Sequence, residues 1–249
     1  MAISLSSLVA PSRRPLIATL CADGGMGKTS LASLWPSPVF IRTEDGSRAI
    51  ESRDDVAMFP VASNTNQVFD ALGALAQEEH NFRTVVIDSV TRFNIMAETE
   101  ILEEDGSKSI NQACGGYGAG YAAVANRHRE LFDACQYLAN TKGMHVVFIA
   151  HADVETIDLP DQAQFSRYTI RMHKKSVSHY TDNVDLVAFI KLKTYTQGGK
   201  DEPVKKATTD GRRIITCYPT PAHVSKNRLG IKADLEFPEG VNPFAEYLA

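Results

Sequence analysis

A glycine-rich run lies between an apolar segment and an amphipathic one near the N-terminus, and few folds accommodate that order. Residues 22–29 read Ala-Asp-Gly-Gly-Met-Gly-Lys-Thr, a P-loop pattern with alanine in place of its first glycine. The apolar residues 15–21 predict a buried strand before the loop, and a helix is expected from Gly27 to a point before Pro36. Backbone N–H groups of such a loop turn inward around phosphate oxygens, aided by the helix dipole. The sequence therefore predicts a phosphate site at a strand–helix junction.

The residue types in the loop predict what each position does. Lys28 is expected to reach the β- and γ-phosphates of a nucleotide, and the Thr29 hydroxyl is expected to ligate Mg²⁺. ATP and Mg²⁺ are therefore the predicted ligands. Further contacts with the nucleotide are expected from the rest of the loop and the next residue, namely Asp23, Gly24, Gly25, Met26, Gly27 and Ser30.

A second motif is a buried strand that ends in a carboxylate. Residues 84–87 read Thr-Val-Val-Ile, and Asp88 follows them. Beside a P-loop, such an aspartate can hold the magnesium ion, so Thr29 and Asp88 form the predicted metal site. Many P-loop ATPases carry a water-activating glutamate directly after this aspartate, but this chain has Ser89 there. A catalytic base must then come from another strand.

Two other polar residues directly follow predicted strands. Glu44 comes after residues 39–43, and His151 comes after residues 145–150. The carboxyl ends of parallel strands meet at the edge of the sheet where ligands bind. Glu44 is therefore the candidate base for the attacking water, the alternative being an ordinary loop acid beside Asp45. His151 is expected to touch the γ-phosphate, because its strand should lie between the P-loop strand and the Asp88 strand.

The remaining pattern predicts one α/β domain over residues 1–249. Helical faces are expected around Val68, Leu72 and Leu75 and along residues 121–135. Beyond His151, strands are expected at 186–195, 212–218 and 223–227, joined by short polar turns. We therefore expect a P-loop core with a mostly parallel, twisted sheet flanked by helices, and antiparallel strands near the C-terminus.

Charge and composition limit the partners. The chain has 249 residues and a formal net charge of −4, so any nucleic-acid contact requires a local basic patch. Residues 162–175 offer one, with Arg167, Arg171, Lys174 and Lys175 and no acid; the alternative is a solvated loop. The four cysteines form no C-x-x-C pair, and no apolar run approaches a membrane span. We expect a cytoplasmic protein with no membrane partner and no zinc site.

The combination of motifs resembles the RecA-like ATPases, and especially the small, core-only, phage-encoded members that serve in single-strand annealing. The likeness is carried by GGMGKTSLA at 24–32, FIRTEDG at 40–46, VVIDSVTRF at 85–93 and HVVFIAH at 145–151, and it spans roughly residues 15–235. It implies that Glu44 occupies the catalytic glutamate position and His151 the polar sensor position.

The same resemblance implies the partners. These would be single-stranded DNA, further copies of the chain in a ring or filament, and a single-strand DNA-binding protein, in a bacterial host cytoplasm. In RecA relatives the DNA contacts lie in mobile loops, which here would be about 104–120 and 152–176. Within the second loop, Arg171, Lys174 and Lys175 are the candidate DNA-binding residues. These 249 residues match the RecA core without its separate terminal domains, so full strand exchange is not expected.

A short basic motif near the C-terminus resembles the Lys-x-Arg finger of DnaB-type hexameric helicases. Lys226 and Arg228 alternate by two, so on a strand they would share a face. Two exposed cations on one face require an anion, and the γ-phosphate bound by a neighbouring subunit is the expected one. The motif therefore predicts an active site completed between subunits.

Three other functions fit parts of the sequence. The P-loop string also resembles the ParA/MinD partition ATPases, but Asp23 stands where those carry a signature lysine. A DnaB-like helicase core is a stronger alternative because of Lys226 and Arg228, although the chain has no room for an added primase-binding domain. The third is a DNA-binding assembly protein with negligible turnover that uses ATP as a switch.

Overall fold

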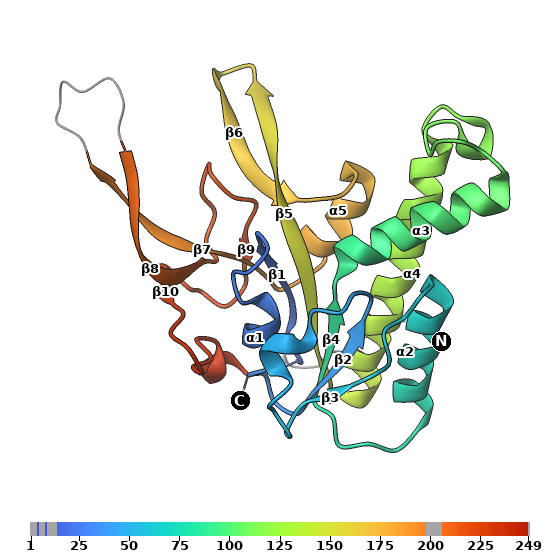
Figure 1. Cartoon of the computed structure of the whole chain (residues 1–249), viewed down its shortest axis with the longest axis horizontal. Helices are drawn as coiled ribbons and strands as arrows, with labels where there is room; N and C mark the ends of the chain where they lie inside the picture. Colours follow the sequence, from blue (N-terminus) through green and yellow to red (C-terminus); the bar gives the residue numbers. More distant parts are fainter. Residues whose placement is uncertain (1–3, 5–7, 9–13, 198–205, 249) are drawn as a thin grey trace.

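The P-loop strand lies near the middle of a ten-stranded sheet in the computed structural model, which describes residues 4, 8, 14–197 and 206–248 (Figure 1). The strands are β1 (Ile17–Ala22), β2 (Pro38–Arg42), β3 (Ala57–Met58), β4 (Thr84–Asp88), β5 (His145–Leu159), β6 (Gln162–Ile170), β7 (Leu186–Gln197), β8 (Lys206–Thr216), β9 (Lys226–Asn227) and β10 (Leu235–Glu236). The helices are α1 (Lys28–Ala32), α2 (Thr65–Gln77), α3 (Val90–Asp105), α4 (Ala119–Lys142) and α5 (Lys174–Thr181), with short 3₁₀ turns at Ser47–Ile50, Ala113–Gly115 and Ala245–Tyr247.

The strand order agrees with the prediction. Along the sheet the order is β10-β8-β7-β1-β5-β4-β2-β3. All neighbours from β7 to β3 run parallel, and β5 lies between β1 and β4, so the expected placement of the His151 strand is confirmed. Strands β8 and β9 pair antiparallel with β7, and β10 pairs antiparallel with β8. The predicted antiparallel edge near the C-terminus is therefore confirmed as well.

Alternate residues of the central strands pack against different layers. Val85 and Ile87 of β4 belong to a buried cluster with residues of α2, α3, α4 and α5, whereas Val86 belongs to a second cluster with residues of α1 and the C-terminal segment. In the part of the chain that is described, no helix is both long enough and apolar enough to cross a bilayer.

The segment from 152 to 176 is not the irregular loop that we expected. Strand β5 continues past Ala150 to Leu159 and pairs antiparallel with β6, from Ala152 opposite Ile170 outward. Pro160 and Asp161, at the turn, were an available hairpin signal in the sequence. Figure 1 shows this hairpin, the β7–β8 pair and the tip of the α3–α4 pair extending from the same end of the molecule.

A buried histidine connects three elements of the larger core cluster. His128 of α4 has no exposed surface. Its Nδ1 lies 2.6 Å from the Tyr180 hydroxyl, and its Nε2 lies 3.0 Å from Oδ1 of Asn94. The Asn94 amide is oriented by its own 2.8 Å hydrogen bond to Glu98. Nε2 therefore donates and Nδ1 accepts, which requires a neutral imidazole.

This histidine should make the fold sensitive to acid. Burial, with a smaller effect of His179, lowers the pKa of His128 from 6.5 to about 3. The unfolded chain then binds a proton that the folded chain excludes, so this contribution is intact above pH 6.5 and is lost progressively down to about pH 3. Between pH 7 and pH 5 we expect His128 to cost about 2 kcal/mol of unfolding free energy. Denaturant unfolding of the wild type and His128→Gln at both values checks this, because the variant should lose less stability on acidification; equal losses would contradict it.

Candidate functional site

The P-loop is shaped by glycines at positions that other residues seldom tolerate. Gly25 and Gly27 have φ values of +75° and +87°, in the left-handed region, and Gly27 is the N-cap of α1. Lys28 starts the helix, is nearly buried, and donates hydrogen bonds to the backbone oxygens of Ala22 (3.0 Å) and Asp23 (2.9 Å). Burial lowers the pKa of the Lys28 ammonium. Hydrogen bonds from the Lys28 ammonium to the loop backbone thus fix its position at the turn between β1 and α1.

A cavity of about 410 Å³ opens at this turn. Most of the predicted nucleotide-binding residues line it: Gly24, Gly25, Gly27, Lys28, Thr29 and Ser30. The other two lie differently. The Asp23 side chain is exposed while its carbonyl binds Lys28, and Met26 packs against the α1-side apolar cluster. Glu44, Asp88 and His151 line the same cavity, so the structure brings together the residues predicted from four separate strands.

The two predicted metal ligands are in contact. The Thr29 hydroxyl donates a 2.8 Å hydrogen bond to Oδ2 of Asp88, whose residue is only 6% exposed. Burial raises the pKa of Asp88, partly offset by the Thr29 hydrogen bond. A hydroxyl and a carboxylate are hard oxygen donors of the kind that Mg²⁺ prefers when it also binds phosphates. These residues therefore fit a nucleotide-bound magnesium ion.

Glu44 is held by two hydrogen bonds to one carboxylate oxygen. Its Oε1 accepts from the Ser89 hydroxyl at 2.8 Å and lies 3.2 Å from Nε2 of His151. The hydrogen bond with His151 is the largest cause of the lowered pKa of Glu44, opposed by burial and aided by Ser89. Sequence reasoning noted only that Ser89 is not a glutamate. The structure shows that Ser89 instead orients a glutamate from the neighbouring strand.

His151 bridges the candidate base and the P-loop lysine. While Nε2 faces Glu44, Nδ1 lies 3.5 Å from Nζ of Lys28. The backbone N–H of His151 donates to the Thr91 hydroxyl at 2.9 Å, which fixes the end of the buried part of β5 against α3. Thr91 was not predicted, because a threonine in the first turn of a helix carries no specific signal. Glu44, His151 and Lys28 thus form one connected set of polar side chains at the cavity.

One residue of the cavity wall comes from an unexpected part of the chain. Arg213 of β8 lines the cavity, and its guanidinium lies 4.4 Å from the centre of the Phe237 ring. A Cβ at position 27 would overlap a nitrogen of that guanidinium, so the flexible arginine would have to shift, whereas the φ of +87° is what requires a glycine there. No local pattern in the sequence distinguishes Arg213 from other strand arginines.

Lys226 and Arg228, the two cations of the predicted finger, both have partners within their own chain. Arg228 makes a 2.9 Å ion pair with Asp185 of its own chain, and Lys226 donates to the backbone oxygen of Asp182. Asp185 also accepts from the N–H of Ile17, at the start of β1 and so at the sheet edge opposite the P-loop. The cations therefore do not lack an anion, because Asp185 provides one. Their role between subunits stays a prediction.

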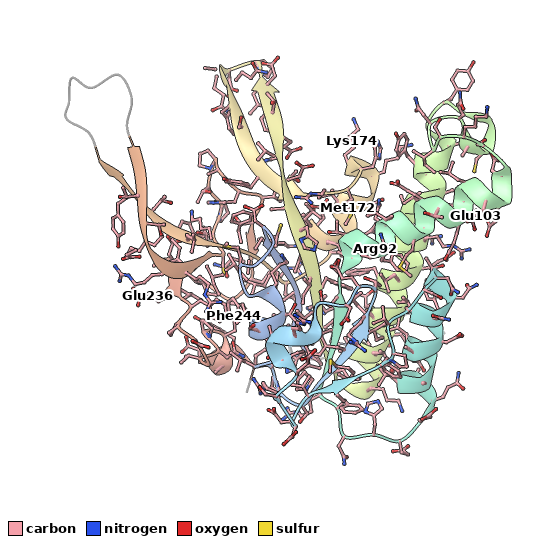
Figure 2. All side chains as sticks on the ribbon, in the orientation of Figure 1. Arg92, Glu103, Met172, Lys174, Glu236 and Phe244 are labelled. Atoms are coloured by element: carbon pink, nitrogen blue, oxygen red, sulfur yellow. The ribbon has the colours of Figure 1, made fainter. Side chains whose placement is uncertain are left out.

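The predicted DNA-binding residues lie at the base of the hairpin rather than on a free loop. Arg171 follows β6, and Lys174 and Lys175 begin α5; all three are exposed. Figure 2 shows Lys174 pointing from α5 toward the end where the hairpins extend. Arg167, by contrast, is paired across the hairpin with Glu155 at 2.7 Å, so its charge is locally balanced.

The two segments predicted to contact DNA touch each other. The Tyr121 and His173 rings are stacked, with centroids 4.0 Å apart, and Nζ of Lys175 donates to the backbone oxygen of Gly118 at 3.0 Å. Tyr117, near them in sequence, is fully exposed. The chain around Gly118 and Tyr121 is thus in direct contact with the basic segment 162–175.

Comparison with known proteins agrees with this geometry at the level of the core. A family model described as an AAA domain matches residues 14–229, which include every residue of the cavity described above. No curated protein matches the chain significantly.

Proposed function

Because this chain belongs to the AAA-domain family of P-loop ATPases, we propose that it couples Mg²⁺-dependent ATP hydrolysis to work on single-stranded DNA, as in recombination by strand annealing. Nucleotide-dependent ATPase activity is what the family as a whole implies. The DNA substrate and the recombination role are our own extension of it.

The convergence of Lys28, Glu44, Asp88 and His151 carries the hydrolysis part of the proposal. ATP and Mg²⁺ would supply the phosphoryl group and the divalent charge that neutralises it. The chain's own residues then bind the phosphate oxygens through Lys28 and the P-loop amides. Glu44, which is ionised at neutral pH and whose pKa is lowered further by His151, orients a water and takes its proton.

The exposed cations at the hairpin base support the DNA part. Arg171, Lys174 and Lys175 have no carboxylate within ion-pair distance among the described residues. The exposed Tyr117 offers a ring on which a base can stack. Cations that follow a backbone together with accessible aromatic rings are typical of surfaces that bind single strands without sequence preference.

An ATPase assay with and without single-stranded DNA tests the proposal directly. We expect hydrolysis that requires Mg²⁺ and rises when single strands are added, together with pairing of complementary strands. Unwinding of a forked duplex would favour the helicase alternative, and tight ATP binding without turnover would favour the switch. Stimulation by duplex DNA alone would contradict the proposal.

The basic surface makes a quantitative prediction. Reversing Arg171, Lys174 and Lys175 to glutamate should weaken single-strand binding and flatten its dependence on salt, because fewer counterions are released. Each lost phosphate contact should reduce the slope of log K against log salt by roughly 0.7, so the total change is about 2. ATP affinity should be unchanged. Fluorescence anisotropy of a labelled oligonucleotide across a salt series measures the slope.

A matched control uses three other exposed cations. Arg14, Arg83 and Lys142 lie at or beside the opposite edge of the sheet, where β1, β4 and β5 begin. Their reversal changes the net charge equally and should leave the slope near that of the wild type. If both triple variants flatten the slope alike, binding follows overall charge and the basic segment is not the DNA surface.

A further inference from the structure

The phosphate cavity contains a second permanent cation besides its lysine. The residues that line it include one lysine, Lys28, and one arginine, Arg213. The carboxylates of Glu44, Asp45 and Asp88 line the same cavity. Arg213 has no ion-pair partner among the described residues. A permanent cation that lines a partly enclosed cavity and has no ion pair with a described carboxylate is a natural partner for an anionic ligand.

The position of Arg213 is defined by packing. Its guanidinium lies over the face of Phe237, a residue only 3% exposed, and β8 and β10 are linked beside it by the hydrogen bond from Phe237 N to Arg213 O at 3.0 Å. The guanidinium also lies next to Gly27, the last glycine of the loop. The arginine is therefore held at the backbone whose N–H groups bind phosphate in P-loops.

The neighbouring arginine, Arg212, differs from Arg213 in its exposure and in its ion pairs. Arg212 is exposed and forms ion pairs with Asp210 at 2.7 Å and Glu236 at 3.4 Å. Successive residues of a strand point to opposite faces, so Arg212 does not line the cavity while Arg213 does. The two residues are a natural pair for comparison.

We propose that Arg213 binds the phosphate chain of ATP held by the P-loop of the same chain. The planar guanidinium can donate two parallel hydrogen bonds to phosphate oxygens, a geometry that a lysine cannot reproduce. The inference rests on the proposed nucleotide binding and deepens it. It makes the C-terminal strands part of the nucleotide site, and it supplies positive charge within one subunit, independently of any finger from a neighbour.

The test compares Arg213→Gln with the matched control Arg212→Gln. Calorimetry with Mg²⁺ and ATP should show affinity about tenfold weaker or more for Arg213→Gln, as expected for a lost charge-assisted hydrogen bond, and nearly unchanged for Arg212→Gln. Thermal unfolding distinguishes a direct contact between Arg213 and ATP from a role of Arg213 in stabilising the fold. Without nucleotide the Arg213→Gln midpoint should stay near that of the wild type, while the rise produced by ATP should shrink.

The possible outcomes distinguish a failure of the Arg213 inference from a failure of the proposed ATP binding on which it rests. Wild-type protein that does not bind ATP would overturn the proposed function itself. If the wild type binds and Arg213→Gln binds equally well, only the Arg213 inference fails. A lowered midpoint without nucleotide together with a full ATP-induced rise would assign Arg213 to folding alone. Should Arg213→Gln not fold, Arg213→Lys takes its place, because lysine keeps the charge but cannot donate two parallel hydrogen bonds. An ATP affinity below that of the wild type then supports the contact, and an equal affinity overturns it.

Discussion

Replacing Glu44 with glutamine should leave ATP bound while its hydrolysis falls by roughly 10² to 10⁴, the range that a general base contributes. Glutamine keeps the size of the side chain and can still meet Ser89 and His151, which lie 2.8 and 3.2 Å from the Glu44 oxygen. It cannot accept a proton from water. The effect should therefore appear in turnover and not in binding, and single-turnover hydrolysis beside calorimetry measures both.

The control for this variant is an acid in the same connection between β2 and β3 that lies outside the cavity. Glu51 is exposed and directly follows the 3₁₀ turn Ser47–Ile50, so Glu51→Gln removes a similar charge without touching the site. It should hydrolyse ATP at the wild-type rate. A Glu44→Gln variant that turns over normally would mean that another residue activates the water, and the RecA-like assignment of this position would be wrong.

Replacing Lys28 with alanine should weaken ATP binding by about a hundredfold or more. The ammonium contributes charge-assisted hydrogen bonds to two phosphates, and each such bond is worth about 1.5–3 kcal/mol. Lys28 also donates hydrogen bonds to the carbonyls of Ala22 and Asp23, so the variant's unfolding midpoint must be measured beside its ATP affinity. Unchanged affinity in a folded Lys28→Ala protein would remove the P-loop assignment.

Two further variants sharpen that result. Lys142→Ala removes an exposed lysine at the opposite edge of the sheet and should bind ATP as the wild type does. Thr29→Val removes the hydroxyl that donates to Asp88 and should mainly reduce the gain in affinity that Mg²⁺ provides. A loss for Thr29→Val that is the same with and without Mg²⁺ would argue against its role as a metal ligand.

Most of the site was predictable because it is built from the ends of parallel strands. Once residues 15–21, 39–43, 84–88 and 145–150 are recognised as buried strands of one sheet, their following side chains must meet at one edge. That rule brought Glu44, Asp88 and His151 to the P-loop without any knowledge of their contacts. The antiparallel edge was predictable for a different reason, because strands joined by short polar turns pair antiparallel.

The parts that were not predictable depend on pairings between distant residues. Arg213 reaches Gly27 only because β8 lies beyond β7 in the sheet, which no local pattern near Arg213 reveals. Asp185 meets Arg228 because β9 pairs with the start of β7, and that contact supplied the anion that we assigned to a neighbouring subunit. The β5–β6 hairpin is mostly exposed, so its strands lack the apolar alternation that identifies half-buried strands.

The backbone carbonyl of His151 accepts a 2.9 Å hydrogen bond from the N–H of Arg171. One residue thus faces the phosphate site with its ring and holds the start of the basic segment with its main chain. If the basic segment binds single-stranded DNA as we propose, any rearrangement of His151 that ATP favours and that alters this bond changes the free energy of DNA binding there. The coupling works equally in both directions. Single-stranded DNA that binds more tightly to the ATP-bound arrangement must raise the affinity for ATP by the same factor by which ATP raises the affinity for the DNA.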